Sequence, residues 1–220
     1  MKKVLLLILA GMFAASSVLA QPSVTVGLGI NQGVFAAEGS ERNFDESGSL
    51  KTTTTEYGAF VDSYASVYVE MGNDTASLGL SYQGEVATPT NVNEANGNDG
   101  GSSTATSTVS AEFESVYTVY GLVKLPMNIY AKGGIVRGDI VVNETQRSGN
   151  TYKDQDLEGY VLGFGYEHEA DAVNVRFELL GHAYDDVSAT NGVATSGNHN
   201  KITISDMIGA NAQLSINKTF

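Results

Sequence analysis

The stretch that decides the fold reads EYGAFVDSYASVYVEM, residues 56–71. Its odd-numbered positions carry no charged side chain, whereas its even-numbered positions include Glu56, Asp62 and Glu70. In a strand, a period of two places these two sets on opposite faces, and a helix would instead distribute the charges around every turn. The stretch therefore predicts a long β-strand with one apolar and one polar face.

The same alternation recurs along the chain, for example in residues 24–31 and 202–220. Short turns are predicted at 72–75, 126–128 and 169–171, where Gly, Asn, Asp and Pro interrupt the pattern. Long polar segments separate these turns from one another. Short turns on one side and long loops on the other are typical of a meander of antiparallel strands that crosses an outer membrane.

We therefore predict an all-β fold, a closed eight-stranded antiparallel up-and-down transmembrane β-barrel over residues 21–220. Every backbone N–H and C=O needs a partner in hydrocarbon, so the sheet has to close. A soluble β-sandwich is the alternative, but its strands usually have about 5–6 residues and the predicted strands are longer. With eight strands the lumen is only wide enough to be filled by side chains.

The first residues predict export. Lys2 and Lys3 precede an apolar stretch over residues 4–15, and Val18-Leu19-Ala20 fits a signal-peptidase site. A membrane anchor is disfavoured because a spanning helix needs about 20 apolar residues. We expect residues 1–20 to be a cleavable signal peptide and the mature chain to reach the outer membrane of a Gram-negative cell.

Composition and motifs exclude several functions. The chain has 25 acidic and 12 basic residues, the wrong balance for binding nucleic acid. It has no cysteine, and no pattern in it indicates a cofactor, a metal site or a catalytic group. His182 is the best-placed histidine, but Gly181-His182-Ala183-Tyr184 lacks the His-x-Ser pairing of lipid A deacylases. We predict that the protein is not an enzyme.

The last strand resembles the C-terminal signature of outer-membrane barrels, in which alternating apolar residues end in an aromatic one. Here the signature residues are Leu214, Ile216 and Phe220, and Lys218 departs from the aromatic residue often found at that place. Residues 130–134 and 163–166 resemble the strand ends of small OmpA-, OmpX- and OmpW-type barrels. The resemblance implies contact with outer-membrane lipid, with lipopolysaccharide and, through the last strand, with the assembly machinery.

The predicted inward faces carry a set of charges that could form a network in the lumen. In the strand near residues 130–142, the apolar residues and Lys132 are predicted to face outward. The predicted network consists of Asp62, Glu70, Glu112, Glu114, Arg137, Asp139, Arg176 and Glu178.

Buried charges are tolerated when they are paired, so we interpret this network as a polar plug. The alternative interpretation is a path for ions. Two functions follow from these interpretations. The first is a non-enzymatic structural or surface-interaction barrel, similar to an adhesin or an anchor. The second is a small passive, porin-like channel.

Overall fold

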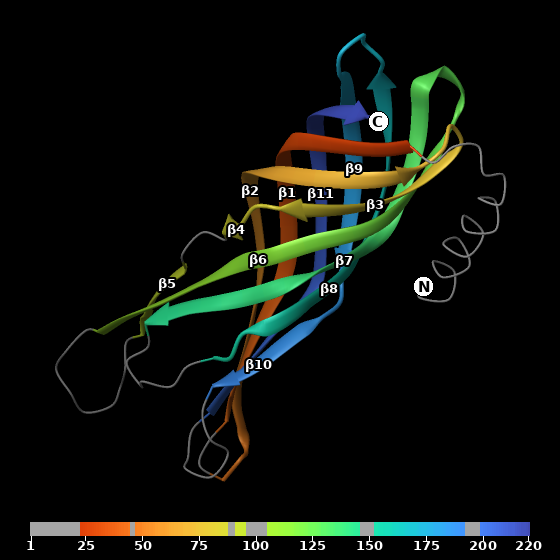
Figure 1. Cartoon of the computed structure of the whole chain (residues 1–220). Helices are drawn as coiled ribbons and strands as arrows, with labels where there is room; N and C mark the ends of the chain where they lie inside the picture. Colours follow the sequence, from red (N-terminus) through yellow and green to blue (C-terminus); the bar gives the residue numbers. More distant parts are fainter. Residues whose placement is uncertain (1–22, 45–46, 88–90, 96–104, 146–151, 192–198) are drawn as a thin grey trace.

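The computed structural model describes residues 23–44, 47–87, 91–95, 105–145, 152–191 and 199–220. Within them a single antiparallel sheet closes on itself, because β1 (Ser23–Phe44) pairs with both β2 (Leu50–Gly72) and β11 (His199–Thr219). Figure 1 shows the resulting barrel. The predicted signal peptide, residues 1–20, lies outside the described residues.

The order of strands around the barrel is β1-β2-β3-β6-β7-β8-β9-β11, which makes eight positions. Two of these positions are extended by shorter strands, because β4 and β5 continue along β6 and β10 continues along β11. The predicted antiparallel eight-stranded barrel is confirmed. The remaining elements are β3 (Ala76–Gln83), β4 (Val86–Ala87), β5 (Asn91–Ala95), β6 (Ala105–Lys124), η1 (Pro126–Asn128), β7 (Ile129–Thr145), β8 (Gln155–His168), β9 (Asn174–Tyr184) and β10 (Val187–Asn191).

The outward face of the barrel is apolar where the strands are fully paired. On β1, Leu28 and Ile30 are 57% and 66% exposed, and on β8 Leu162 and Phe164 are also exposed. These side chains form a band on the part of the barrel that the hydrocarbon would surround. No helix in the described parts of the chain has the length and apolarity to cross a membrane.

The short turns lie where the sequence predicts them, and local chemistry explains their shape. After β2, Asn73 Oδ1 accepts hydrogen bonds from the backbone N–H groups of Thr75 and Ala76 at 2.8 and 3.0 Å. Such a side-chain bond closes the turn without help from elsewhere. The turn after β6 contains η1, where Met127 and Asn128 have positive φ.

Two bulges change the alternation of side chains in the half of the barrel away from the short turns. The β6–β7 register shifts between Glu114 and Tyr117, and Ser115 has φ 50°. The β1–β11 register shifts at Ala36, close to Asp206, which has φ 51°. Because an extra residue in a bulge moves the following side chains to the other face, the pattern below each bulge does not continue above it.

The predicted faces of β7 are corrected by the structure. Tyr130, Lys132, Val136 and Ile140 are all at most 5% exposed inside the barrel, whereas Arg137 faces outward. The physical reason is that the lumen beside this strand is partly apolar. Along β7 the inward residues are therefore apolar apart from Lys132, and the charged residues Arg137 and Asp139 face outward.

The last residue joins the two ends of the sheet. Phe220 N–H donates to the Val24 carbonyl at 2.8 Å, and Val24 N–H donates to the Phe220 carbonyl at 3.2 Å. The side chains of Leu214, Ile216 and Phe220 all face outward and are at least half exposed.

Deleting Phe220 is therefore expected to remove two backbone hydrogen bonds from the closing strand pair, at about 1 kcal/mol each. We expect lower stability and a smaller folded fraction in the outer membrane, measured by the mobility difference between unboiled and boiled samples on SDS gels. Tyr57→Ala removes an aromatic residue that is 81% exposed and serves as the control. Equal outer-membrane levels of the two variants would contradict this role of Phe220.

Candidate functional site: a charged plug in the lumen

The half of the lumen next to the short turns is built on three tyrosine–glycine pairs across neighbouring strands. Tyr68 lies opposite Gly27, Tyr120 opposite Gly79 and Tyr130 opposite Gly165 in the strand registers. A Cβ atom at any of these glycines would collide with the ring of its tyrosine. The glycines therefore let the rings lie flat against the inner wall and direct their hydroxyl groups into the lumen.

Arg176 on β9 lies at the centre of the first ion-pair group. Its Nη1 donates to Glu70 Oε1 at 2.7 Å, and its Nε donates to Glu167 Oε2. Tyr120 Oη also donates to Glu70 Oε1, at 2.8 Å. The guanidinium lies 5.5 and 5.4 Å from the ring centroids of Tyr68 and Tyr130, within the range of a cation–π contact.

The second ion-pair group joins Lys132 on β7 to Glu178 on β9. Lys132 Nζ donates to both carboxylate oxygens of Glu178, at 3.2 and 3.1 Å, and Tyr130 Oη donates to Glu178 Oε1 at 2.8 Å. Lys132 Nζ also lies 4.1 Å from the centroid of the Tyr120 ring. Tyr120 therefore contacts both ion-pair groups and links them into one network.

We call this network the charged plug, consisting of Glu70, Lys132, Glu167, Arg176 and Glu178 with Tyr68, Tyr120 and Tyr130. Its five charged residues are at most 8% exposed, although they lie inside a barrel. Two cations face three carboxylates, so the formal charge is 2 − 3 = −1 if all are ionised. Multiple charge-assisted bonds hold each group, which is what makes buried ions tolerable.

A second polar layer lies next to the plug on its side away from the short turns, and we call it the amide layer. It consists of Asn31, Ser66, His182 and Asn211. Asn31 Nδ2 donates to Ser66 Oγ at 3.0 Å, and Asn211 Nδ2 donates to Asn31 Oδ1 at 2.9 Å. His182 Nε2 lies 2.6 Å from Asn211 Oδ1. Hydrogen bonds thus continue along the inner wall from β2 through β1 and β11 to β9.

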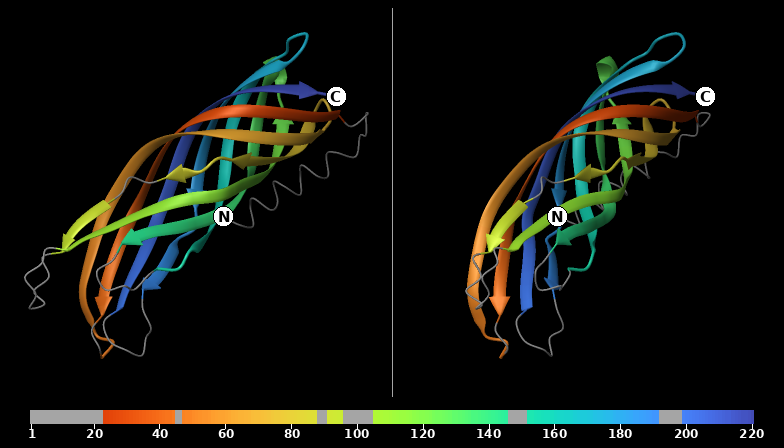
Figure 2. Two further views of the ribbon diagram at one scale, coloured as in Figure 1. Left: turned by 60° about the vertical axis from the view of Figure 1, so that its left-hand side comes forward. Right: turned by 90° about the vertical axis from the view of Figure 1, so that its left-hand side faces the viewer.

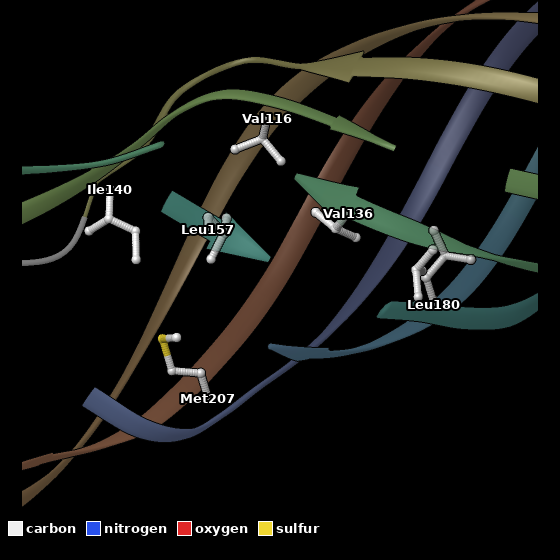
Figure 3. Close-up of a cluster of buried hydrophobic side chains, with 7 residues drawn as sticks. Val116, Val136, Ile140, Leu157, Leu180 and Met207 are labelled. Atoms are coloured by element: carbon white, nitrogen blue, oxygen red, sulfur yellow. The ribbon is translucent and has the colours of Figure 1, made fainter. Parts of the chain in front are cut away.

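At the level of the amide layer and on its side away from the plug, the lumen is also lined by apolar side chains. Buried side chains from β6, β7, β8, β9 and β11 point toward one another there, as Figure 3 shows. This apolar cluster consists of Val116, Val136, Ile140, Leu157, Val161, Leu180 and Met207. The charged plug lies nearest the short turns, and the apolar cluster begins at the level of the amide layer, where Leu180 lies opposite Asn211 and Val161 opposite His182.

The structure brings three of the eight predicted network residues together, namely Glu70, Arg176 and Glu178. Asp62 lies further out along β2, where its carboxylate accepts the Ser63 N–H at 2.7 Å. Arg137 faces outward and pairs with Glu158 at 2.5 Å, both side chains being more than 40% exposed. These residues contribute nothing to the plug.

The other three predicted residues also lie outside the plug. Asp139 is exposed on the outward face of β7. Phe113 packs against the apolar cluster above the bulge at Ser115, so its neighbours Glu112 and Glu114 point to the opposite face. The predicted inward position of these three acids is therefore corrected.

Sequence reasoning missed two charged residues of the plug, Lys132 and Glu167, and its three tyrosines. For Glu167 the signal was present, because the alternation that places Gly163 and Gly165 inward continues to it. For Lys132 the physical rule that a charged residue at membrane depth faces the interior outweighs the apolar pattern of its strand.

Comparisons with known proteins agree with this architecture. No family model and no curated protein matches the chain. The outer membrane protein OprG from Pseudomonas aeruginosa aligns at a TM-score of 0.50 with 12% identity, covering 87% of this chain and 95% of OprG. This chain has an outer-membrane β-barrel fold. The predicted resemblance to small outer-membrane barrels is confirmed at the level of the fold, which points to the bacterial outer membrane.

Two other solved barrels are similar at lower scores. The Ail attachment invasion locus protein of Yersinia pestis aligns at a TM-score of 0.41 with 6% identity, over 86% of this chain and 98% of Ail. The outer membrane protease OmpT from Escherichia coli aligns at 0.41 with 9% identity, over 89% of this chain and 97% of OmpT.

Proposed function

We propose that this protein is a non-enzymatic surface-interaction barrel, whose plugged periplasmic half anchors strands that project outside the cell. The observation that carries the proposal is the charged plug. Two cations, three carboxylates and three tyrosine rings fill the section of the lumen nearest the periplasm, and they are bonded to one another. An ion would have to displace these contacts to pass.

The projecting strands support the surface role. β2 runs from Gly72 at the turn to Leu50 and has 23 residues. With the usual rise and tilt this is roughly 55 Å along the barrel axis, against an apolar band of about 25 Å. Residues 50–59 of β2 are all exposed and include four consecutive threonines. These strands would pass through the lipopolysaccharide layer and present a polar surface beyond it.

The proposal predicts that the wild-type barrel conducts little current in a planar lipid bilayer. The plug is closed by direct side-chain contacts, so we expect no stable open level. A large and stable conductance would support the alternative, a small passive channel for ions or solutes.

Labelling of intact cells with a membrane-impermeant amine reagent tests the projecting surface. Lys51 is exposed on the projecting part of β2 and should react, whereas Lys124 is exposed beside a periplasmic turn and should react only after the cells are permeabilised. Lys132 in the plug serves as a buried control in both conditions. Labelling of Lys124 but not Lys51 in intact cells would contradict the proposed orientation.

A further inference from the structure

Two polar side chains interrupt the apolar outward face of β1 and β2. Gln32 and Ser63 lie opposite each other in the strand register, and both are exposed. The outward neighbours of Gln32 along β1 are Ile30 and Val34, which are 66% and 52% exposed. The outward neighbour of Ser63 on the side away from the short turn is Val61, which is 62% exposed. The polar pair therefore lies among apolar side chains on the outer wall of the barrel.

The polar pair lies at the depth of the hydrocarbon. Gln32 is 32 − 23 = 9 residues along β1 from the first residue of that strand, Ser23. With the usual rise and tilt this is roughly 22 Å along the barrel axis, within an apolar band of about 25 Å. Val34 and Val61 continue the band on the far side of the pair. A polar group at this depth has no water to bond with, so it needs another partner.

The Gln32 amide is held in one orientation by two hydrogen bonds. Its Nε2 donates to the Asp62 backbone carbonyl at 3.3 Å, and the Ser63 hydroxyl donates to Gln32 Oε1 at 2.8 Å. A backbone carbonyl can only accept, so the nitrogen and the oxygen of the amide are assigned without ambiguity. The amide is therefore fixed on the outer wall.

These two bonds use only half of what the Gln32 amide offers. An amide group has two N–H donors and two lone pairs on its oxygen. One N–H and one lone pair of Gln32 remain, and no hydrogen bond to a described residue uses either. Leaving such groups unpaired in hydrocarbon is unfavourable. The position therefore calls for a partner that offers one acceptor and one donor side by side.

The Gln32 side chain of a second copy meets this requirement. A two-fold axis along the membrane normal brings residues of equal depth together, so that the same patch of both copies meets. Each Gln32 amide then donates its remaining N–H to the oxygen of the other amide. The two bonds are reciprocal, and they use the remaining donor and acceptor of both copies.

The residues beside Gln32 leave room for this approach. Ala212 on β11 and Ser63 on β2 flank Gln32 at the same depth, and both have small side chains. Figure 2 shows β2, β1 and β11 side by side along the wall of the barrel. With the two-fold axis at β1, Ser63 of one copy lies against Ala212 of the other. Small residues at a contact within the membrane let the two backbones come close together.

We propose that Gln32 forms the centre of a two-fold contact between two copies of this barrel, in which the two amides exchange a pair of hydrogen bonds. The contact surface consists of the outward faces of β1, β2 and β11 within the apolar band. A second copy fits because the unused groups of Gln32 are complementary to themselves and carry no charge. This contact goes beyond the proposed surface function and does not depend on it, since a monomeric barrel keeps its plug and its projecting strands.

Cross-linking locates the contact. The chain has no cysteine, so Val34→Cys introduces a single thiol beside the proposed axis. The purified full-length barrel is folded into phosphatidylcholine vesicles and treated with a short bis-maleimide, and we expect a cross-linked dimer on SDS gels. Phe164→Cys on β8 places the thiol on a lipid-facing strand that is not part of the contact. This control measures random collisions and should give little dimer.

Removing the amide tests the hydrogen bonds. Gln32→Leu keeps a side chain of similar size that suits lipid, but it removes both reciprocal bonds. The dissociation constant of the dimer, measured by sedimentation equilibrium in detergent micelles, should rise roughly tenfold or more. Ala212→Leu should also weaken the dimer, because it places bulk against Ser63 of the second copy. Phe164→Leu is the matched control and should leave the dissociation constant unchanged.

Gln32→Glu gives a pH-dependent test of the same contact. Two protonated carboxyl groups can pair reciprocally as two amides do, whereas two carboxylates repel each other. This variant should therefore dimerise at about pH 4 and dissociate at about pH 9, on either side of the titration of a carboxyl group. The wild-type dimer should be the same at both pH values, since an amide does not titrate.

Three results would overturn the proposal: cross-linking of Val34→Cys no stronger than that of Phe164→Cys, a dissociation constant that Gln32→Leu leaves unchanged, or a wild-type barrel that is monomeric. In the last case the Gln32 amide would bond to lipid or to another protein. Heat-dependent gel mobility establishes folding for each variant. If Gln32→Leu does not fold, the pH response of Gln32→Glu decides the question.

Discussion

Arg176→Ala is expected to destabilise the barrel by about 3–5 kcal/mol, because it leaves two buried carboxylates without their cation. Glu70 and Glu167 both accept from Arg176, and Glu70 is only 3% exposed. The loss should appear as a lower guanidinium concentration at the unfolding midpoint, followed by gel mobility because the chain has no tryptophan. The same change opens space across the lumen, so bilayer current should rise above the wild-type level.

Arg137→Ala provides a matched control for this experiment. Arg137 also pairs with a glutamate, but the Arg137 and Glu158 side chains are 51% and 42% exposed. Exposed ion pairs contribute about 0–1 kcal/mol, so this variant should remain close to wild type in both stability and current. Equal effects of the two substitutions would show that the plug does not carry the stability or the closure of the lumen.

The strands and the lipid-facing side of most of them could be predicted from the sequence, because hydrocarbon imposes a strict rule. Leu28, Phe164 and Phe177 occupy positions that face lipid, where only an apolar side chain is tolerated. The residues before and after them in the strand face the lumen and can be polar. The turn at Asn73 was predictable for a similar reason, since its side-chain bonds are local.

The faces of β7 could not be predicted in this way, because the apolar part of the lumen follows the same rule as the lipid side. Val136 and Ile140 pack against Leu157 and Met207 from other strands, and nothing near them in sequence reveals those partners. Alternation alone indicates that two faces differ and does not identify the inner one.

The bulges at Ser115 and Asp206 also prevent the inner face of a strand from being identified by alternation alone. Neither residue is a glycine, yet both have positive φ, so the local sequence gives little warning. Continuing the alternation of residues 116–120 through the bulge predicts Glu112 and Glu114 in the lumen, and the register shift between Glu114 and Tyr117 makes this prediction wrong. Alternation therefore predicts inward-facing site residues best close to the short turns, where no bulge shifts the register.

The Lys132–Glu178 pair gives the sharpest test of whether the plug is a coupled unit. Lys132→Met leaves the Glu178 carboxylate, which is 2% exposed, without its cation. The Tyr130 hydroxyl is then its remaining donor in the plug. Glu178→Gln removes the negative charge from beside a buried ammonium group. Each single substitution should lower stability by about 3–5 kcal/mol, because each leaves one buried charge uncompensated.

The double variant should be more stable than either single variant. The amide oxygen of the glutamine introduced by Glu178→Gln could still accept from the Tyr130 hydroxyl, and methionine would fill the volume of the lysine chain without a charge. Replacing a buried ion pair by neutral groups of similar size is often neutral or stabilising, so a change of about 1 kcal/mol or less from wild type is expected. The measurement is a double-mutant cycle of unfolding free energies in lipid vesicles.

The sign of the coupling decides the outcome of this cycle. A buried network predicts that the two losses do not add. Two single losses of about 3 kcal/mol or more and a double loss of about 1 kcal/mol or less give a coupling of about 5 kcal/mol or more, above the usual range for contacting pairs. A water-filled lumen would screen both charges and predict single losses below about 1 kcal/mol that simply add. Additive losses would therefore reject the plug and favour an open, hydrated path through the barrel.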